Sequence, residues 1–320
     1  MSEPLPDFRL LRPETLDQAL AALAEPGAKP MAGGTDLVVN LRRGLVDAPI
    51  LVDLSGIEGF AAIEMRDDGL TIGAGVTLAA LAADESVAAR YQAIHDAAEV
   101  IAGPGHRAAA TVGGNLCLDT RCLYYNQSHW WRKSNDFCLK YRGDTCHVAP
   151  KGNRCRAAFS GDLAPALMVF DAIAEIAGPD GRRSLPLAEM YREDGADYLT
   201  LAPGEIVVAV RLPATTANSA YDKIRVRGAV DFPLAGVAIA CRDAEGGARS
   251  LRLAVTGTNS MPLTIEIADL PAGGDLDQFC ADLEKAVQKA VSPQRTTTIQ
   301  PHYRRLAASA LARRLARRLL

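Results

Sequence analysis

The chain has 320 residues, with 35 Lys and Arg against 38 Asp and Glu, a formal net charge of −3 and 48% hydrophobic residues. This balance allows two or three globular units and gives no reason to expect nucleic acid as a partner. The first ten residues lack the apolar core of a signal peptide, and no apolar run approaches the roughly 18 residues of a membrane span. We therefore expect a cytoplasmic protein that does not bind a membrane.

The first fifty-odd residues alternate between strand and helix patterns. The expected strands are residues 8–11, 29–32 and 50–53. Thr15 and Gln18 have the spacing of a capping box at the start of one helix, and Gly44 closes a second helix over residues 37–43. This alternation predicts a small α/β unit over residues 1–56.

From residue 57 the pattern changes to paired strands and longer helices. Asp67-Asp68-Gly69 is a turn signal between two strand-like runs, and residues 91–102 have a helical pattern. After a long polar segment, residues 163–178 and 204–213 resume the helix and strand patterns. These features predict a larger mixed unit over residues 57–213.

The last hundred residues look like a separate α+β unit. A linker is expected at residues 215–220. Three strand-like runs follow, residues 223–227, 233–243 and 250–258, and two helices, residues 277–291 and 303–320. The last helix carries six arginines: Arg304, Arg305, Arg313, Arg314, Arg317 and Arg318. They predict a solvated charged face or, alternatively, a docking surface for an acidic partner.

Two glycine pairs are candidates for ligand binding. Gly33-Gly34 follows a strand and precedes a helix, a position where backbone N–H groups favour an anion. Alone, such a loop is more typical of a tight turn than of a ligand site. A second loop of similar composition, Thr111 to Asn115, suggests that both together grip the diphosphate of a dinucleotide.

Five of the seven cysteines fall within 39 residues, in a polar and aromatic segment that has neither helical nor strand periodicity. A reducing compartment makes disulfides unfavourable, so a cysteine cluster indicates metal binding or catalysis. Zinc and a 4Fe-4S cluster both accept four thiolates. The wide spacing, without a Cys-x2-4-Cys knuckle, favours the cluster, and buried unliganded thiols are the alternative. Cys117 directly follows the second glycine loop and is expected in the core behind it.

The motifs KPMAGGTDL, IGAGVTL, TVGGN and GDLAPALMVFDA occur in this order. Together they resemble the FAD-binding subunit of the xanthine dehydrogenase family. The resemblance implies an α+β fold, with a two-part FAD-binding domain over residues 1–56 and 57–213 and a flavoprotein C-terminal domain over residues 217–320. Partner subunits would carry the molybdenum cofactor and 2Fe-2S clusters in a hetero-oligomer, expected as a dimer of heterotrimers.

One departure from most relatives is a long insertion, at about residues 117–158, between Asn115 and Asp162. It is similar to an insertion in the β subunit of 4-hydroxybenzoyl-CoA reductase that holds an additional 4Fe-4S cluster. By this resemblance the cluster would be bound by Cys122, Cys138, Cys146 and Cys155.

The resemblance also implies the FAD contacts. The first loop would wrap the diphosphate and ribose with Lys29, Pro30, Met31, Ala32, Gly33, Gly34, Thr35 and Asp36. The second wall would be Thr111, Gly114 and Asn115. Asp162 would contact the sugar or phosphate end, Ile101 would line the pocket and Lys223 would reach in from the C-terminal unit. No catalytic residue is expected on this chain.

The implied function is electron transfer from a low-potential donor such as ferredoxin, through the 4Fe-4S cluster and FAD, to 2Fe-2S and molybdenum centres of partner subunits. There 4-hydroxybenzoyl-CoA would be dehydroxylated to benzoyl-CoA. The alternative within the family is the FAD subunit of another molybdenum hydroxylase or dehydrogenase that acts on an aromatic or CoA-linked substrate, in which electrons run outwards. A zinc-stabilised nucleotide-binding module and a stand-alone FAD reductase are further alternatives.

Overall fold

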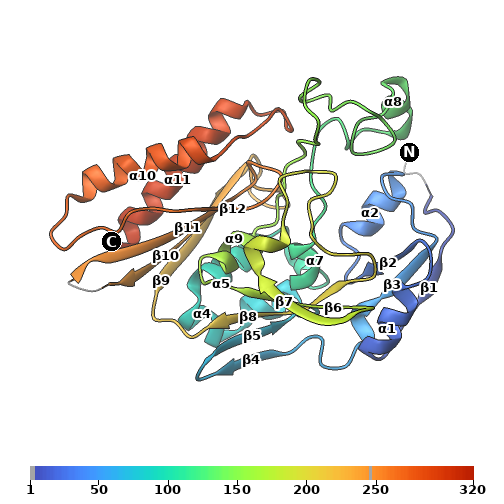
Figure 1. Ribbon diagram of the computed structural model, residues 1–320, viewed down its shortest axis with the longest axis horizontal. Helices are drawn as coiled ribbons and strands as arrows, with labels where there is room; N and C mark the ends of the chain where they lie inside the picture. Colours follow the sequence, from blue (N-terminus) through green and yellow to red (C-terminus); the bar gives the residue numbers. More distant parts are fainter. Residues whose placement is uncertain (1–3, 245–246) are drawn as a thin grey trace.

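The computed structural model describes residues 4–244 and 247–320, and within them the strands form three sheets (Figure 1). The first is a parallel sheet of order β1-β3-β2. Its elements are β1 (Arg9–Leu11), α1 (Leu16–Leu23), β2 (Ala28–Met31), α2 (Leu37–Arg42) and β3 (Ile50–Asp53). The expected strands are confirmed to within a residue. Pro30 lies in β2, an edge strand, where a missing N–H is tolerated.

The helix ends of this unit follow their sequence signals. Thr15 caps α1, since its Oγ1 accepts a hydrogen bond from Gln18 N at 3.3 Å, and Gln18 Oε1 accepts one from Glu14 N. In the usual capping box this side chain would accept from the N–H of the cap residue itself, whereas Gln18 accepts from Glu14, one residue before the cap. Gly44 has a φ of +56° after α2, the left-handed conformation that suits a glycine at a helix end.

The second sheet is antiparallel, of order β4-β5-β8-β6-β7. Its strands are β4 (Ile63–Arg66), β5 (Gly69–Gly73), β6 (Ile173–Gly178), β7 (Gly181–Pro186) and β8 (Ile206–Pro213). The helical elements of this unit are α3 (Leu78–Ala83), α4 (Glu85–Arg90), α5 (Gln92–Val100), α6 (Pro104–Arg107), α7 (Val112–Leu116) and α9 (Leu163–Met168), with 3-10 turns at Leu54–Gly56 and Leu187–Met190. β7 was not predicted from the sequence, because this edge strand is polar and largely exposed and so shows no apolar alternation.

The third sheet is antiparallel, of order β12-β11-β10-β9, and α10 and α11 pack on it (Figure 1). Its elements are β9 (Asn218–Ile224), β10 (Ala235–Asp243), β11 (Arg249–Thr256), β12 (Leu263–Ile265), α10 (Leu276–Ala290) and α11 (Pro301–Leu319). The linker expected at residues 215–220 is too long, because β9 already pairs with β10 from Asn218. The strand expected over residues 223–227 ends at Ile224.

The insertion, residues 117–158, is called the cysteine segment below. It rises beside α2, in green at the top of Figure 1, and contains one helix, α8 (His129–Ser134). The expectation that it lacks regular structure is wrong for these six residues, since the Ser128 side chain caps a helix there. Across the described residues, no helix is both long and apolar enough to cross a membrane.

Candidate functional site

The first glycine loop connects β2 to α2 and is at least partly exposed along its length, from Lys29 to Asp36. Gly34 has a φ of +67°, a conformation that favours glycine. A Cβ at Gly33 would overlap the backbone carbonyl of Ala109. The loop therefore lies directly against the segment that precedes the second glycine pair, an approach that only glycine allows.

The second glycine pair lies inside the short helix α7 rather than in a loop, which corrects the expectation. Thr111 caps this helix, because its Oγ1 accepts a hydrogen bond from Gly114 N at 3.1 Å. A Cβ at Gly113 would lie 2.8 Å from the Cβ of Ala74, so close packing on the end of β5 requires glycine. Asn115 Oδ1 accepts from Leu163 N at 3.1 Å and so joins α7 to the start of α9.

Asp162 and Lys223 form a buried ion pair, with Lys223 Nζ 3.0 Å from Asp162 Oδ1 and both side chains at most 4% exposed. The Tyr221 hydroxyl donates to the same carboxylate oxygen at 2.6 Å. Burial raises the pKa of Asp162, whereas Lys223 and Tyr221 oppose that shift. Tyr221 is not among the residues predicted from the sequence. It stands two positions before Lys223 on β9, a spacing that places both side chains on one face of the strand.

Ile101 follows α5 and is 7% exposed. Its neighbourhood is tied to the C-terminal unit, because Arg225 Nη1 donates to Val100 O at 3.0 Å and Val230 N donates to Ala102 O at 3.3 Å. The predicted site residues thus come from five separate segments. Successive contacts join the first loop to the segment before α7, α7 to the start of α9, and Asp162, just before α9, to β9.

Arg121 links the first glycine loop to the cysteine segment. Its guanidinium forms an ion pair with Asp36 and lies 4.9 Å above the centre of the Phe232 ring. Asp36 also accepts from Asn40 Nδ2 at 3.0 Å. Because Arg121 directly precedes Cys122, this pair ties the candidate ligand loop to the first of the four cysteines. No sequence motif pointed to Arg121.

Cys122, Cys138, Cys146 and Cys155 line a single cavity. The other lining residues are Tyr124, Tyr125, Leu139, Lys140, His147, Val148 and Ala157. Cys117 is not among them. Burial raises the pKa of Cys122 to about 11 and that of Cys155 to about 12. Among the described residues, no three His, Cys, Asp or Glu side chains converge closely enough to hold a single metal ion.

Cations attach the cysteine segment to the rest of the chain. The segment has eight Lys or Arg residues and three Asp, although the whole chain is net acidic. Arg142 pairs with Asp47 at 3.0 Å and Arg154 with Glu193 at 3.1 Å, both carboxylates lying outside the segment.

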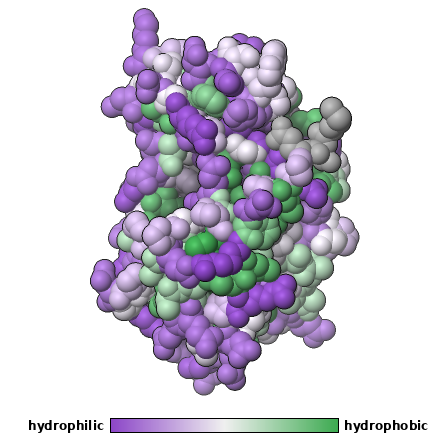
Figure 2. Space-filling model, turned by 90° about the vertical axis from the view of Figure 1, so that its right-hand side faces the viewer, coloured by the Kyte–Doolittle hydropathy of each residue, from purple (hydrophilic) through white to green (hydrophobic). Residues whose placement is uncertain are grey.

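Figure 2 shows the side of the molecule that carries the first sheet. The upper part of this view, where the cysteine segment projects, is mostly hydrophilic.

Arg132 provides the most buried of these attachments, at 2% exposure. It donates to the carbonyls of Arg43 at 3.1 Å, Gly44 at 2.9 Å and Gln127 at 3.2 Å. Since Arg43 and Gly44 end α2, this one side chain supplies partners for carbonyls that the helix leaves unpaired.

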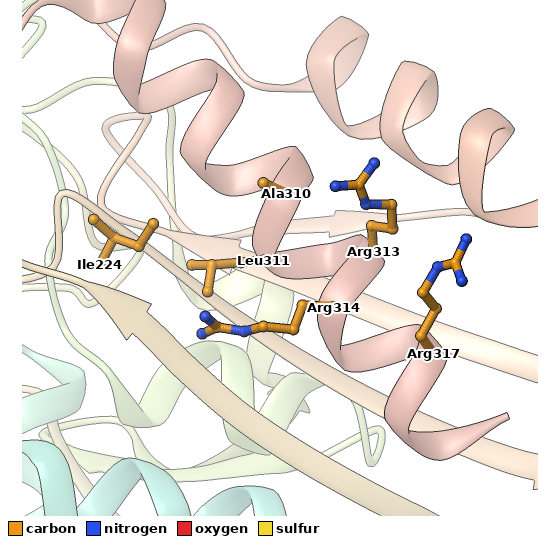
Figure 3. A pocket seen from close by; sticks show the side chains of 6 residues that line it. All are labelled: Ile224, Ala310, Leu311, Arg313, Arg314 and Arg317. Carbon is orange, nitrogen blue, oxygen red and sulfur yellow. The ribbon is translucent and has the colours of Figure 1, made fainter.

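A groove separate from the cysteine cavity lies along α11. It is lined by Ile224, Ala310, Leu311, Arg313, Arg314 and Arg317 (Figure 3). Its three arginines pair with Glu284, Asp222 and Asp277 respectively. Arg304 belongs to neither a solvated face nor a docking surface, because it is buried and donates to the carbonyls of Leu234, Gln294 and Gly257. The expected basic face is therefore largely neutralised.

Residues 6–215 match the family described as FAD binding domain in molybdopterin dehydrogenase. The chain therefore belongs to this family, as a flavoprotein subunit of oxidoreductases of the xanthine dehydrogenase and carbon monoxide dehydrogenase type. The aldehyde oxidoreductase FAD-binding subunit PaoB of Escherichia coli (strain K12) is 35% identical over 264 residues, 79% of this chain and 81% of that protein. The carbon monoxide dehydrogenase medium chain of Afipia carboxidovorans is 27% identical over 318 residues, 97% of this chain and 96% of that one.

Solved structures show the same fold. Carbon monoxide dehydrogenase from Hydrogenophaga pseudoflava has a TM-score of 0.79 at 21% identity, and quinoline 2-oxidoreductase from Pseudomonas putida 86 has 0.77 at 20%. Each alignment covers 99% of this chain and 98% of the other. These structures confirm the expected mixed α+β fold, and the match over residues 6–215 confirms the expected family.

Proposed function

We propose that this chain is the electron-transfer subunit of a molybdenum-containing oxidoreductase, with FAD between the two glycine segments and a 4Fe-4S cluster among Cys122, Cys138, Cys146 and Cys155. The observation that carries the proposal is that these four cysteines, scattered over the cysteine segment, line one cavity. The Arg121–Asp36 pair, which connects that segment to the first glycine loop, supports it. When bound, the flavin would exchange one or two electrons and the cluster one.

The FAD-binding part of the proposal rests on the exposed first loop and its neighbours. Lys29 to Asp36 would surround the diphosphate and ribose, with the first-turn N–H groups of α2 directed at an anion. Thr111, Gly114 and Asn115 would form the second wall, and Ile101 would line the pocket. Asp162 and Lys223, held together by their ion pair, would close the site from the side of the C-terminal unit.

The donor set fits an iron–sulfur cluster. Four thiolates are the usual ligands of a 4Fe-4S cluster, and each binds a different iron, so the cysteines surround a larger space than one ion needs. The four cysteines of this chain line one cavity, which agrees with that ligand set. The shell of Tyr124, Tyr125, Leu139 and Val148 would limit access of water.

For the substrate, the relatives favour oxidation. PaoB is by name part of an aldehyde oxidoreductase, so we propose that the partner molybdenum subunit oxidises an aldehyde or related compound. The partners would be that subunit and a 2Fe-2S subunit, in a dimer of heterotrimers. A second candidate is reduction of 4-hydroxybenzoyl-CoA with ferredoxin as donor, which the similarity of the cysteine insertion favours.

Metal and flavin analysis tests the cofactor assignment. The complex, purified without oxygen, is expected to contain FAD and, beyond the iron of its 2Fe-2S partner, four iron and four acid-labile sulfide per copy of this chain. Cys138→Ser should lower the iron and sulfide counts while FAD stays bound. The matched control is Cys280→Ser, which changes a buried cysteine of α10 and should leave iron unchanged. Equal iron in both variants would remove the cluster from this chain.

Activity separates the two substrate candidates. The purified complex is assayed with a panel of aldehydes and an electron acceptor, and separately with 4-hydroxybenzoyl-CoA and a reduced viologen. Turnover of aldehydes alone supports the first candidate. Benzoyl-CoA formation alone would replace it with the second.

A further inference from the structure

Lys140 is a buried cation beside the four cysteines. Its side chain is 6% exposed, and it lines the same cavity as Cys122, Cys138, Cys146 and Cys155. Its Nζ donates to Asp119 Oδ1 at 2.7 Å, to Thr120 Oγ1 at 2.5 Å and to Gly195 O at 2.6 Å. The Tyr125 and Tyr198 rings lie beneath it, with centres 5.0 and 5.5 Å from Nζ. The ammonium group is thus fixed in position by three oxygens and two rings.

The charge distribution around the cavity is one-sided. Among the eleven described residues that line it, Lys140 alone has a permanently charged side chain, and Asp119, its counter-charge, lies outside the lining. A cluster bound by four thiolates is anionic, and reduction adds one more negative charge. Charges in a poorly solvated region interact more strongly than in water, so a fixed cation here favours the reduced form.

Stability alone gives no good reason for this lysine. Burying the Lys140 ammonium costs desolvation energy that its attraction to a carboxylate 20% exposed barely offsets, so an apolar side chain would serve as well in packing. The two tyrosine rings already supply an apolar wall. A charge retained at such a position therefore indicates an electrostatic role.

We propose that Lys140 raises the reduction potential of the iron–sulfur centre and that Asp119 partly offsets its charge. The inference rests on the proposed function, since it requires a cluster at the four cysteines. Lys140 is a positioning residue for electron transfer and makes no covalent contact with the reacting atoms. The pair would set how readily electrons leave or enter the centre relative to FAD.

The test is a potentiometric titration of the purified complex, followed by electron paramagnetic resonance of the reduced cluster. Lys140→Met should shift the midpoint potential of the cluster to a more negative value. At a fixed potential the ratio of oxidised to reduced cluster should rise about tenfold, which corresponds to about 59 mV for one electron. Asp119→Asn should shift it in the opposite direction. The FAD midpoint should stay unchanged in both variants.

Two controls isolate the charge. Lys140→Arg keeps the cation, so its midpoint potential should differ from the wild-type value by only a fraction of the Lys140→Met shift. Lys133→Met removes an exposed lysine of α8 and should leave the midpoint potential unchanged. If Lys140→Met retains all its iron with an unshifted midpoint, the inference is wrong. If Lys140→Met loses its iron, the Asp119→Asn variant decides. A cluster midpoint potential in that variant that is unchanged or more negative than in the wild type overturns the inference. A wild-type chain without cluster iron would instead refute the proposed function.

Discussion

The C-terminal unit and the cysteine segment are stabilised by different forces. In the C-terminal unit, nineteen buried apolar residues from β9 to β12, α10 and α11 form one core. The cysteine segment contributes only four residues to a five-residue buried cluster, and two of those four are Cys122 and Cys155. Burial of apolar surface, which stabilises by about 25 cal/mol per Å², is therefore a larger source of order in the C-terminal unit than in the cysteine segment.

The cysteine segment also carries backbone strain. Asp136, Phe137 and Arg142 have φ values of +55°, +57° and +61°, a conformation that disfavours residues other than glycine. Each costs about 1–3 kcal/mol when held in place. Ordering an irregular segment costs a further ~1–2 kcal/mol per residue in backbone entropy. Cationic side chains attach the cysteine segment to the rest of the chain, and the proposed cluster would add ligand bonds there, whereas the C-terminal unit depends on packing.

The largest effect on global stability is expected in the C-terminal unit. Leu315 on α11 is 1% exposed, so Leu315→Ala leaves a cavity and should lower the free energy of unfolding by about 2–5 kcal/mol. Chemical denaturation of the complex measures it, with Leu306→Ala, at 42% exposure on the same helix, as the control. Iron content per folded chain should not change. A loss of iron in Leu315→Ala would show that the two regions are not independent.

The next effect is local to the cysteine segment. Arg132→Met leaves three carbonyls without a hydrogen-bond donor. This should lower the free energy of detaching the cysteine segment from the rest of the chain by about 1–3 kcal/mol. We expect faster proteolytic cleavage within residues 117–158 and an unchanged denaturation midpoint for the C-terminal unit. Lys133→Met, which changes the exposed neighbour, should behave as wild type. Equal cleavage rates in the two variants would contradict the role of cationic attachment.

A smaller effect is expected where the two candidate cofactor sites meet. Asp36→Asn weakens the pair with Arg121 and should reduce FAD affinity about fivefold, equivalent to about 1 kcal/mol, because the first glycine loop loses its tie. Fluorescence titration of the flavin-free chain measures the affinity. Arg121→Met should have a similar effect, and the double variant should add little more. Additive losses would show that the two side chains act separately.

The smallest effect is expected for an ion pair outside both regions. Arg183 holds the pKa of Glu205 below its usual value. A depressed folded-state pKa stabilises the protein above the unfolded pKa of about 4.3, and this stabilisation is lost as the pH falls through the folded value. Since Arg183 is 41% exposed, solvent screening limits the contribution to about 0.5 kcal/mol. Glu205→Gln should show that loss at pH 7 and none below pH ~3, by denaturation at each pH. A loss that persists in acid would exclude the ion pair as its cause.

Much of the fold could be predicted because local signals and tertiary structure agree. The capping residue Thr15, the Gly44 stop and the turn at Gly69 all mark element ends that the structure confirms to within a residue or two. β7 could not be predicted, because its exposed polar face shows no period, and α7 was hidden by glycines that the packing against Ala74 requires.

The candidate site was predictable in its composition but not in its internal contacts. The glycine segments and the four cysteines were apparent from the sequence. The pairing of Asp162 with Lys223 and the tie between Arg121 and Asp36 were not, because residues 61 and 85 positions apart carry no local sign of their contact. Lys140 was likewise one of eight cations in a basic segment, and what distinguishes it is the cavity that it shares with the four cysteines.

Hydrogen exchange on the complex with and without its cluster tests most directly whether sulfur-bound iron orders the cysteine segment. After mild chelation of iron under reducing conditions, peptides from residues 121–158 should lose their protection, while peptides from β10 and α11 keep theirs. Protection of residues 121–158 that survives complete removal of the cluster iron would contradict the account, because packing and ion pairs alone would then suffice.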